Sequence, residues 1–255
     1  MKPLEIKHRV IGGGEPLICV PVVEQDAQSV IREITYLSQS TADMIEWRVD
    51  AFRDFTDYNA IRSVFEAVAP LLGEKLFLYT FRTAQQGGMA QVKAEQLDDL
   101  HDLAAESGCV DLVDLEFFEE DRPLHKIKRL REMGVSVIAS HHDFEQTPSP
   151  EVMKMLLEKM CAGGADIVKL AVMPQNYKDV LNLLDVTAQF REENPDTPVI
   201  TMSMGSLGGI SRISGETFGS CVTFGAHEKP SAPGQFAMKE LRQMLDTIHA
   251  SSQIQ

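Results

Sequence analysis

The chain is poor in basic residues. Its 255 residues include 24 lysines and arginines against 38 aspartates and glutamates, which gives a formal net charge of −14. A chain this acidic repels phosphate backbones and anionic membrane surfaces, and no local basic patch in the sequence offsets that repulsion. We therefore expect neither nucleic acid nor membrane as a partner.

Cysteine is also scarce. The four cysteines Cys19, Cys109, Cys161 and Cys221 lie too far apart in sequence for a clustered zinc site or for the disulfide framework of a small secreted domain. No stretch approaches the roughly 18 consecutive apolar residues of a membrane span, and the N-terminal segment lacks the apolar core and cleavage site of a secretory signal. The sequence thus predicts a cytoplasmic protein with reduced thiols.

Eight short apolar runs recur along the chain, separated by segments with helical periodicity. The runs cover residues 17–22, 44–50, 76–82, 112–118, 135–142, 166–172, 198–204 and 221–225. The helical segments cover residues 27–37, 58–72, 92–105, 124–133, 150–160, 179–190 and 236–248. Strands that alternate with helices indicate parallel pairing, and eight such units in this length predict an α/β fold, a (β/α)8 TIM barrel, as a single domain over residues 1–255.

Two further features bear on the fold. Residues 4–10, with the segment that follows them, are expected to form an N-terminal β-hairpin arm that closes the barrel floor. The alternative to a barrel is a doubly wound open sheet. That fold is less favoured because no glycine-rich dinucleotide fingerprint follows the first strand; the run Gly12-Gly13-Gly14 precedes it.

Charged residues gather near the carboxyl ends of the predicted strands. Side chains alternate along a strand, so residues two apart share a face. Any one of these charges is explained by a strand reaching the surface, but the mouth at the carboxyl ends is also where barrel enzymes place catalytic groups. Burying so many ionisable groups is costly unless they pair. The predicted ring at the mouth comprises Glu46, Arg48, Arg82, Asp114, Glu116, His142 and Lys169.

Lys169 is the most informative member of this ring. It lies in the run DIVKLAV, where apolar residues surround it and nothing within the strand neutralises its charge. Desolvation lowers the pKa of a lysine, and the free amine is a nucleophile toward a ketone. An ion pair with Asp114 or Glu116 is the alternative interpretation.

His142 lies on the preceding predicted strand and reaches the same mouth, so it is the expected general acid and base. Its neighbour His141 points to the opposite face of that strand. Because one strand cannot direct both rings inward, the pair does not predict a metal site.

Two later segments have the character of anion-binding loops. MGSLGGISR carries Ser211 and Arg212 after the seventh predicted strand, and HEKPSAPGQ carries Ser231 and Gln235 after the eighth. Loops seven and eight form the usual anion site of this fold, and an arginine can hold a carboxylate with two hydrogen bonds. Flexible glycine-rich turns would explain the glycines but not Arg212, Ser231 and Gln235 together.

These residues belong to motifs that occur together in one known family. In order along the chain they are EWRVD, TFR with a following GG, DLE, SHHDF-x-QTP, ADIVKLAVMP, ITMSM, GGISR and SAPGQ. The set spans residues 46–235 and resembles type I 3-dehydroquinate dehydratase of the shikimate pathway. The resemblance implies a (β/α)8 barrel, usually a homodimer, that acts on the small molecule 3-dehydroquinate with no metal or organic cofactor.

The resemblance also implies roles for individual residues. Lys169 matches the Schiff-base lysine that condenses with the C3 ketone, and His142 matches the general base that removes the C2 proton and then helps the C1 hydroxyl to leave as water. Glu46, Arg48 and Arg82 match groups that hold the ring hydroxyls and surround the imine. Arg212, Ser231 and Gln235 match the carboxylate clamp and the lid over the substrate.

One position departs from the family's pattern. The family motif has a glutamate before the paired glycines, where this chain reads FRTAQQGG with Gln86. That glutamate is expected to support the charged form of the histidine, so the uncharged Gln86 should lower the pKa of His142. The sequence therefore predicts slower proton transfer with imine formation intact.

Two rival functions remain at this point. A class I aldolase also uses a lysine imine in a barrel, but its phosphorylated substrates would favour loops more basic than these. An activity-impaired variant or non-catalytic ligand-binding barrel is suggested only by Gln86, and the presence of both Lys169 and His142 argues against it.

Overall fold

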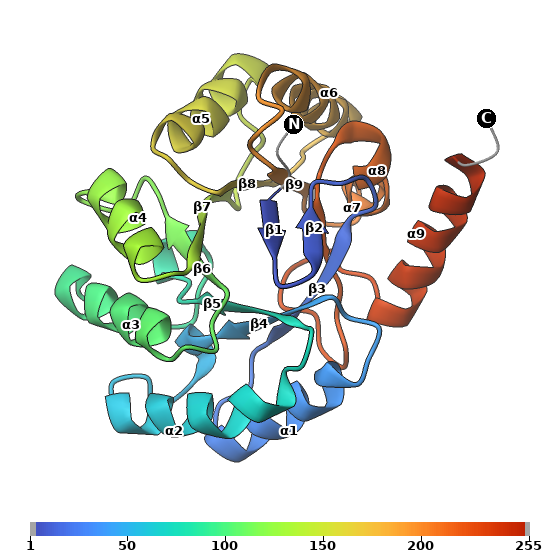
Figure 1. The fold of residues 1–255 in the computed structure, drawn as a ribbon. Helices are drawn as coiled ribbons and strands as arrows, with labels where there is room; N and C mark the ends of the chain where they lie inside the picture. The colour runs from blue at the N-terminus through green and yellow to red at the C-terminus, as the bar shows by residue number, and fades with distance from the viewer. Residues whose placement is uncertain (1–3, 253–255) are drawn as a thin grey trace.

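The computed structural model describes residues 4–252 and shows a parallel barrel surrounded by helices (Figure 1). Within those residues the barrel sheet has eight strands in the order β10-β3-β4-β5-β6-β7-β8-β9, and every hydrogen-bonded pair is parallel. A bridge between Val199 and Ser220 brings the two ends of the sheet together, so the barrel is nearly closed. The strands are β3 (Leu17–Val22), β4 (Met44–Arg48), β5 (Leu76–Thr80), β6 (Leu112–Glu116), β7 (Ser136–Asp143), β8 (Ile167–Val172), β9 (Val199–Ser203) and β10 (Val222–Phe224). The predicted barrel is confirmed, and the doubly wound alternative is wrong.

Helices cover the outside of the barrel. The long ones are α1 (Ala27–Ser38), α2 (Tyr58–Val68), α3 (Ala94–Glu106), α4 (Pro123–Glu132), α5 (Pro150–Ala162), α6 (Tyr177–Glu193) and α9 (Met238–Ser252). The side chains of Asp26, Asp57, Ser149 and Asn176 start four of them by accepting hydrogen bonds from main-chain N–H groups of the first turn. None of the helices within residues 4–252 is both long and apolar enough to cross a membrane.

Several of the predicted strands and helices are longer than those in the structure. The expected strand 44–50 ends at Arg48, where the 3-10 turn η1 (Val49–Ala51) begins, and the expected strand 76–82 ends at Thr80. The expected helix 58–72 ends at Val68 and continues as the 3-10 turn η2 (Ala69–Leu71), because Pro70 has no N–H to extend the helical ladder. The short helices α7 (Gly209–Ile213) and α8 (Gly215–Phe218) were not predicted, since neither is long enough to show periodicity.

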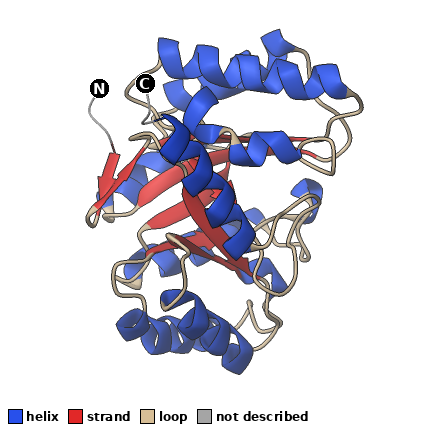
Figure 2. Ribbon diagram, turned by 90° about the vertical axis from the view of Figure 1, so that its right-hand side faces the viewer, coloured by secondary structure: helices blue, strands red, loops and turns tan. Residues whose placement is uncertain are grey.

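A hairpin closes the barrel floor, as predicted. It pairs β1 (Leu4–Ile6) with β2 (Arg9–Ile11) in antiparallel register. Arg9 Nη1 lies 2.7 Å from Asp43 Oδ1, and Lys7 Nζ lies 2.8 Å from Asp111 Oδ2; both aspartates precede barrel strands at their amino ends. Figure 2 shows the hairpin at one end of the barrel and long loops at the other.

The inward faces of the strands change character from floor to mouth. Apolar side chains such as Met44, Leu112 and Ile167 fill the lower interior and pack against Ile11 of the hairpin. Two residues further along the same strands, the inward positions are Glu46, Asp114 and Lys169. The outward residues between them join the helices in a second apolar layer. The strand period therefore carries the ionisable side chains to the mouth above an apolar plug.

One buried histidine in the helical layer makes stability dependent on pH. His101 of α3 is 3% exposed, its ring meets Tyr79 edge-on, and its Nε2 has no hydrogen-bond partner among the described residues. Burial, with the nearby Lys126 charge, lowers the pKa of His101 to about 4. The neutral ring is therefore favoured by folding, and this stability is present above about pH 6.5 and is lost as the pH falls toward 4.

The free energy of unfolding of the wild type should fall between about pH 7 and about pH 4.5, partly because the buried ring of His101 becomes protonated. We expect this fall to be smaller by about 2–3 kcal/mol in His101→Leu, because the variant has no buried ring to protonate. Denaturant unfolding at the two pH values measures this. His249→Leu is the control, since the Glu216 carboxylate raises the pKa of His249 and its removal should not protect against acid. If the free energy of unfolding falls as much in the His101 variant as in the wild type, His101 is not a cause of the acid sensitivity.

Candidate active site

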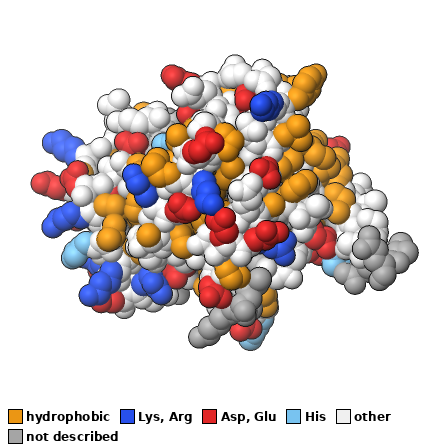
Figure 3. Space-filling view, turned by 90° about the horizontal axis from the view of Figure 1, so that it is seen from above, with side chains coloured by type: hydrophobic (Ala, Val, Ile, Leu, Met, Phe, Trp, Pro, Cys, Tyr) orange, Lys and Arg blue, Asp and Glu red, His pale blue; other side chains and the backbone are white. Residues whose placement is uncertain are grey.

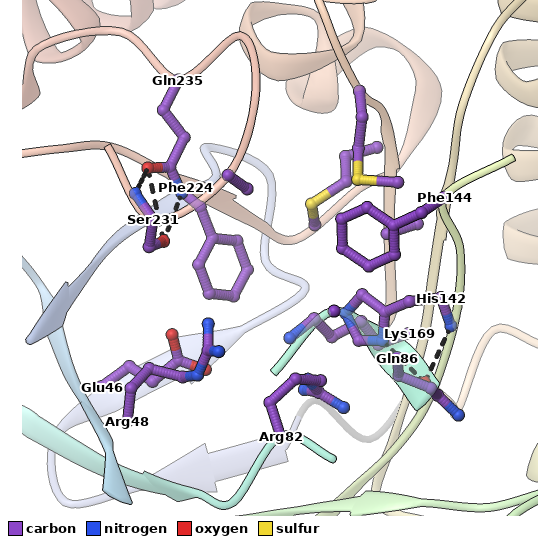
Figure 4. Close-up of a pocket in the computed structure, with 15 residues that line it drawn as sticks. Glu46, Arg48, Arg82, Gln86, His142, Phe144, Lys169, Phe224, Ser231 and Gln235 are labelled. Atoms are coloured by element: carbon purple, nitrogen blue, oxygen red, sulfur yellow. Dashed lines mark hydrogen bonds between the residues drawn. The ribbon is translucent and has the colours of Figure 1, made fainter. Parts of the chain in front are cut away.

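A pocket opens at the carboxyl ends of the strands (Figure 4). Eight of the residues singled out from the sequence line it: Glu46, Arg48, Arg82, Gln86, His142, Lys169, Ser231 and Gln235. Asp114 and Glu116 lie behind this lining and bind basic side chains that belong to it, while Arg212 contacts the loop of residues 227–235. Sequence reasoning gave no role to Phe144, Met202 and Met204, which also line the pocket.

A carboxylate on another strand balances the charge of Lys169. Its Nζ lies 3.0 Å from Asp114 Oδ2, and Asp114 Oδ1 lies 2.8 Å from Arg82 Nη2. Burial alone would raise the pKa of Asp114, but Arg82 and Lys169 hold it well below the usual range. Ser140 Oγ adds a hydrogen bond of 2.6 Å to the same carboxylate. The structure therefore contains the ion pair between Lys169 and Asp114, because β6 supplies the counter-charge that the strand of Lys169 lacks. An amine held in this pair can still act as a nucleophile once it has released its proton.

Phe224 was missed by the sequence interpretation. Its ring centre lies 4.6 Å from Lys169 Nζ, a distance typical of a cation–π contact. Phe224 is the last residue of β10 and lines the pocket together with Lys169. Only its place at the carboxyl end of the last strand could have indicated it.

Two glutamates hold the remaining polar groups in place. Glu116 Oε1 accepts hydrogen bonds from Arg82 Nη1 at 3.0 Å and from the Thr83 main-chain N–H at 2.9 Å. Glu46 Oε1 accepts one from Thr80 Oγ1 at 2.8 Å. Arg82 thus has fixed carboxylate partners on β6 and also lines the pocket.

His142 is oriented by Gln86. The main-chain N–H of His142 and its Nδ1 both lie 3.0 Å from Gln86 Oε1. A main-chain N–H can only donate, so the facing atom of Gln86 is the amide oxygen, and Nδ1 must also carry a hydrogen. Nε2 of the neutral ring is then free to accept a proton.

Burial and nearby positive charge both favour the neutral form of His142. Burial and the charges of Arg82 and Lys169 hold the pKa of His142 well below its usual value, with Asp114 opposing them. His141 lies on the other side of β7, where its ring meets Phe118 edge-on at 5.3 Å. The two adjacent histidines therefore do not converge on one point.

Paired glycines bring Gln86 to this position. The 3-10 turn η3 (Ala84–Gln86) ends at Gly87, whose φ of +82° is a left-handed conformation that favours glycine. A Cβ on Gly88 would lie 1.8 Å from the carbonyl oxygen of Arg82. The GG motif is thus a steric requirement for the turn that carries Gln86.

Arg212 contacts the lid loop, the segment 227–235 that the family resemblance predicts to cover the substrate. Its Nη2 donates to the Pro233 carbonyl at 2.9 Å, whereas Nε and Nη1 have no partner among the described residues although the side chain is 1% exposed. Burial lowers the pKa of Arg212 to about 10. Ser231 and Gln235 bind each other, with Gln235 Nε2 donating to Ser231 Oγ at 3.0 Å. Ser211 instead shapes its own turn by bonding Ser203 N and Gly208 O.

The chain matches a family model described as type I 3-dehydroquinase over residues 18–252. The chain belongs to this family. A 3-dehydroquinate dehydratase of Syntrophotalea carbinolica is 41% identical over 250 residues, covering 98% of this chain and 99% of the relative. One of Listeria monocytogenes is 42% identical over 250 residues with the same coverage.

Solved structures agree with these relatives. A type I 3-dehydroquinate dehydratase of Clostridium difficile, with covalently modified comenic acid, has a TM-score of 0.94 at 38% identity and covers 98% of this chain and 99% of its own. A 3-dehydroquinate dehydratase of Geobacillus kaustophilus has the same TM-score at 35% identity, covering 98% and 97%. Family membership excludes the aldolase alternative, and nothing in these matches supports an impaired or non-catalytic barrel.

We expect Gln86→Glu to raise kcat and to move the acid limb of the kcat–pH profile to higher pH. A carboxylate beside Nδ1 would raise the pKa of His142 toward neutrality and make it a stronger base. Initial rates across pH measure both effects, with Gln85→Glu as a control that adds the same charge one residue away. A kcat that does not rise would contradict the proposed limit on proton transfer.

Proposed function

We propose that the chain removes water from 3-dehydroquinate to give 3-dehydroshikimate through an imine on Lys169. Family membership makes the enzyme a hydro-lyase. The observation that carries the residue assignment is the placement of a buried amine and a neutral histidine on the same cavity: Lys169 is 3% exposed, and His142 faces the pocket beside it (Figure 4).

The first step joins substrate and enzyme. The Lys169 amine, once it has released its proton, attacks the C3 ketone, and the ketone oxygen leaves as water to give an iminium. Asp114 remains beside the nitrogen as the counter-ion of that positive charge. The electron demand of the iminium then makes the C2 proton removable.

His142 carries the proton in the second step. Its unprotonated Nε2 takes the C2 proton, and the resulting imidazolium returns it to the C1 hydroxyl, which leaves as water. A water molecule then hydrolyses the conjugated iminium, which restores the Lys169 amine and releases the unsaturated ketone. One water is consumed by hydrolysis and two are released, so the net reaction is the loss of one water.

The remaining pocket residues hold the substrate. Arg48, Arg82 and Glu46 supply charged hydrogen-bonding groups for the ring hydroxyls around the imine. Arg212 is suited to the substrate carboxylate because two of its buried nitrogens lack partners within the described part of the chain. Ser231 and Gln235 then close over the ligand from the lid loop. The Clostridium difficile relative was solved with covalently modified comenic acid, which is consistent with covalent chemistry in this family.

Borohydride trapping tests the assignment of Lys169. We expect incubation with 3-dehydroquinate and borohydride to leave a reduced adduct on the peptide that contains Lys169, detected by mass spectrometry. Lys169→Met should abolish both adduct and product. His142→Gln should still form the adduct but release little product, because it blocks only the proton-transfer step. Product formation by Lys169→Met, or an adduct confined to another lysine, would contradict the mechanism.

We further propose that the enzyme is a homodimer. Tyr177 and Leu181 lie one turn apart on α6 and are 78% and 65% exposed, and Val152 and Met155 of the adjacent α5 are 41% and 40% exposed. Figure 3 looks onto this side of the molecule, where hydrophobic side chains gather. Light scattering should give twice the chain mass of 28.3 kDa. Tyr177→Lys combined with Leu181→Lys should shift the mass to that of one chain; a monomeric wild type would contradict the proposal.

A cytoplasmic location is proposed on the state of the thiols. All four cysteines are free, and Cys19 and Cys221 are buried. Free thiols persist most readily in a reducing compartment.

A further inference from the structure

Asp50 is a buried carboxylate at the mouth of the barrel that does not line the pocket. It lies in η1, immediately after β4, and is 3% exposed. Its two oxygens receive the fork of Arg48: Nε lies 2.8 Å from Oδ1, and Nη2 lies 2.8 Å from Oδ2. Burial opposes its ionisation, but the Arg48 charge holds the pKa of Asp50 below its usual value.

The same carboxylate also binds the loop that carries Gln86. Oδ1 accepts a hydrogen bond from the Arg82 main-chain N–H at 3.2 Å, and Oδ2 accepts one from the Met89 main-chain N–H at 3.0 Å. Arg82 and Met89 are the two ends of the segment 82–89, and Gln86 lies between them. The Met89 side chain is 61% exposed, so it adds little packing to fix the far end of this loop.

The Asp50 carboxylate thus connects Arg48, on one side of the pocket, with the 82–89 loop that carries Gln86. Arg48 faces the cavity from β4, and Gln86 holds His142 from the opposite side through its amide oxygen. A carboxylate has about four hydrogen-bonding sites, and all four are used here to fix an arginine and both ends of a loop. Neither Arg48 nor the 82–89 loop can move without breaking bonds to Asp50.

We propose that Asp50 is a positioning residue of the dehydratase that sets Arg48 and, through the 82–89 loop, the Gln86 contact to His142. It touches neither substrate nor reacting atoms. Asparagine at this position keeps the volume but has only one acceptor oxygen, so it cannot bind the Arg48 fork and both main-chain N–H groups at once. The inference rests on the roles proposed above for Gln86 and His142.

The test combines Asp50→Asn with Gln86→Leu in a double-mutant cycle. We expect Asp50→Asn to lower kcat roughly tenfold or more, because small misplacements of catalytic groups are costly. Since part of that loss passes through Gln86, it should be at least about threefold smaller in the Gln86→Leu background. Hydrogen exchange of residues 83–89 should accelerate in Asp50→Asn alone.

Asp43→Asn is the matched control. Asp43 is also buried, pairs with Arg9 and accepts a main-chain N–H from Ile18, but it lies at the floor. It should lower stability while leaving kcat and the exchange of residues 83–89 unchanged. Additive effects of Asp50→Asn and Gln86→Leu, or a kcat of Asp50→Asn within twofold of the control, would overturn the inference.

A second variant covers the case in which Asp50→Asn fails to fold. Met89→Pro removes one N–H donor to Asp50 at an exposed position and leaves the Arg48 pair in place; it should also lower kcat, and wild-type kcat would overturn the inference. Borohydride trapping on the wild type separates the two proposals. If the wild type forms the reduced adduct on Lys169 but Asp50→Asn and Met89→Pro keep the wild-type kcat, only the proposed role of Asp50 is wrong.

Discussion

The site depends on the Asp114 carboxylate, which lies between two buried cations. Lys169 and Arg82 both contact it from within the barrel, where a lone charge would be strongly penalised. Removing the carboxylate would leave two cations close together above an apolar plug. The ion pair between Lys169 and Asp114 also suits the proposed reaction, because the lysine nitrogen is positively charged both as an ammonium and as an iminium. One fixed anion can therefore balance the nitrogen from the resting state through the intermediate.

Around that pair, backbone geometry decides which groups reach the substrate. The strand period brings Lys169 and His142 inward, but the histidine becomes a usable base only when a loop from β5 presents an amide oxygen to its Nδ1. That loop needs two adjacent glycines to turn, and its ends are held by Asp50. Binding groups on β4 and proton-transfer groups on β7 are thus linked through a segment that belongs to neither strand.

Much of this arrangement could be predicted from the sequence, and the reason is periodicity. Alternation along each strand placed Glu46, Arg48, Asp114 and Lys169 on inward faces, and eight repeats implied the barrel that brings them together. Which side chains on different strands contact one another could not be predicted from this periodicity. The partner of Lys169 was one of two candidates, and Phe224 had no charge to mark it. Asp50 lies only two residues after Arg48, yet its bonds to Arg82 and Met89 depend on a loop conformation that periodicity does not encode.

The neutral Gln86 is consistent with the electrostatics of this pocket. Burial and the cations Arg82 and Lys169 already favour an uncharged His142, which is the form that must accept the C2 proton. An amide oxygen fixes the ring tautomer as well as a carboxylate would, because the main-chain N–H of His142 determines which end of the amide faces it. What the amide cannot supply is stabilisation of the imidazolium once the proton has been taken. Gln86 therefore separates two functions that a carboxylate combines: orientation of the base is preserved, while stabilisation of its protonated form is left to Asp114.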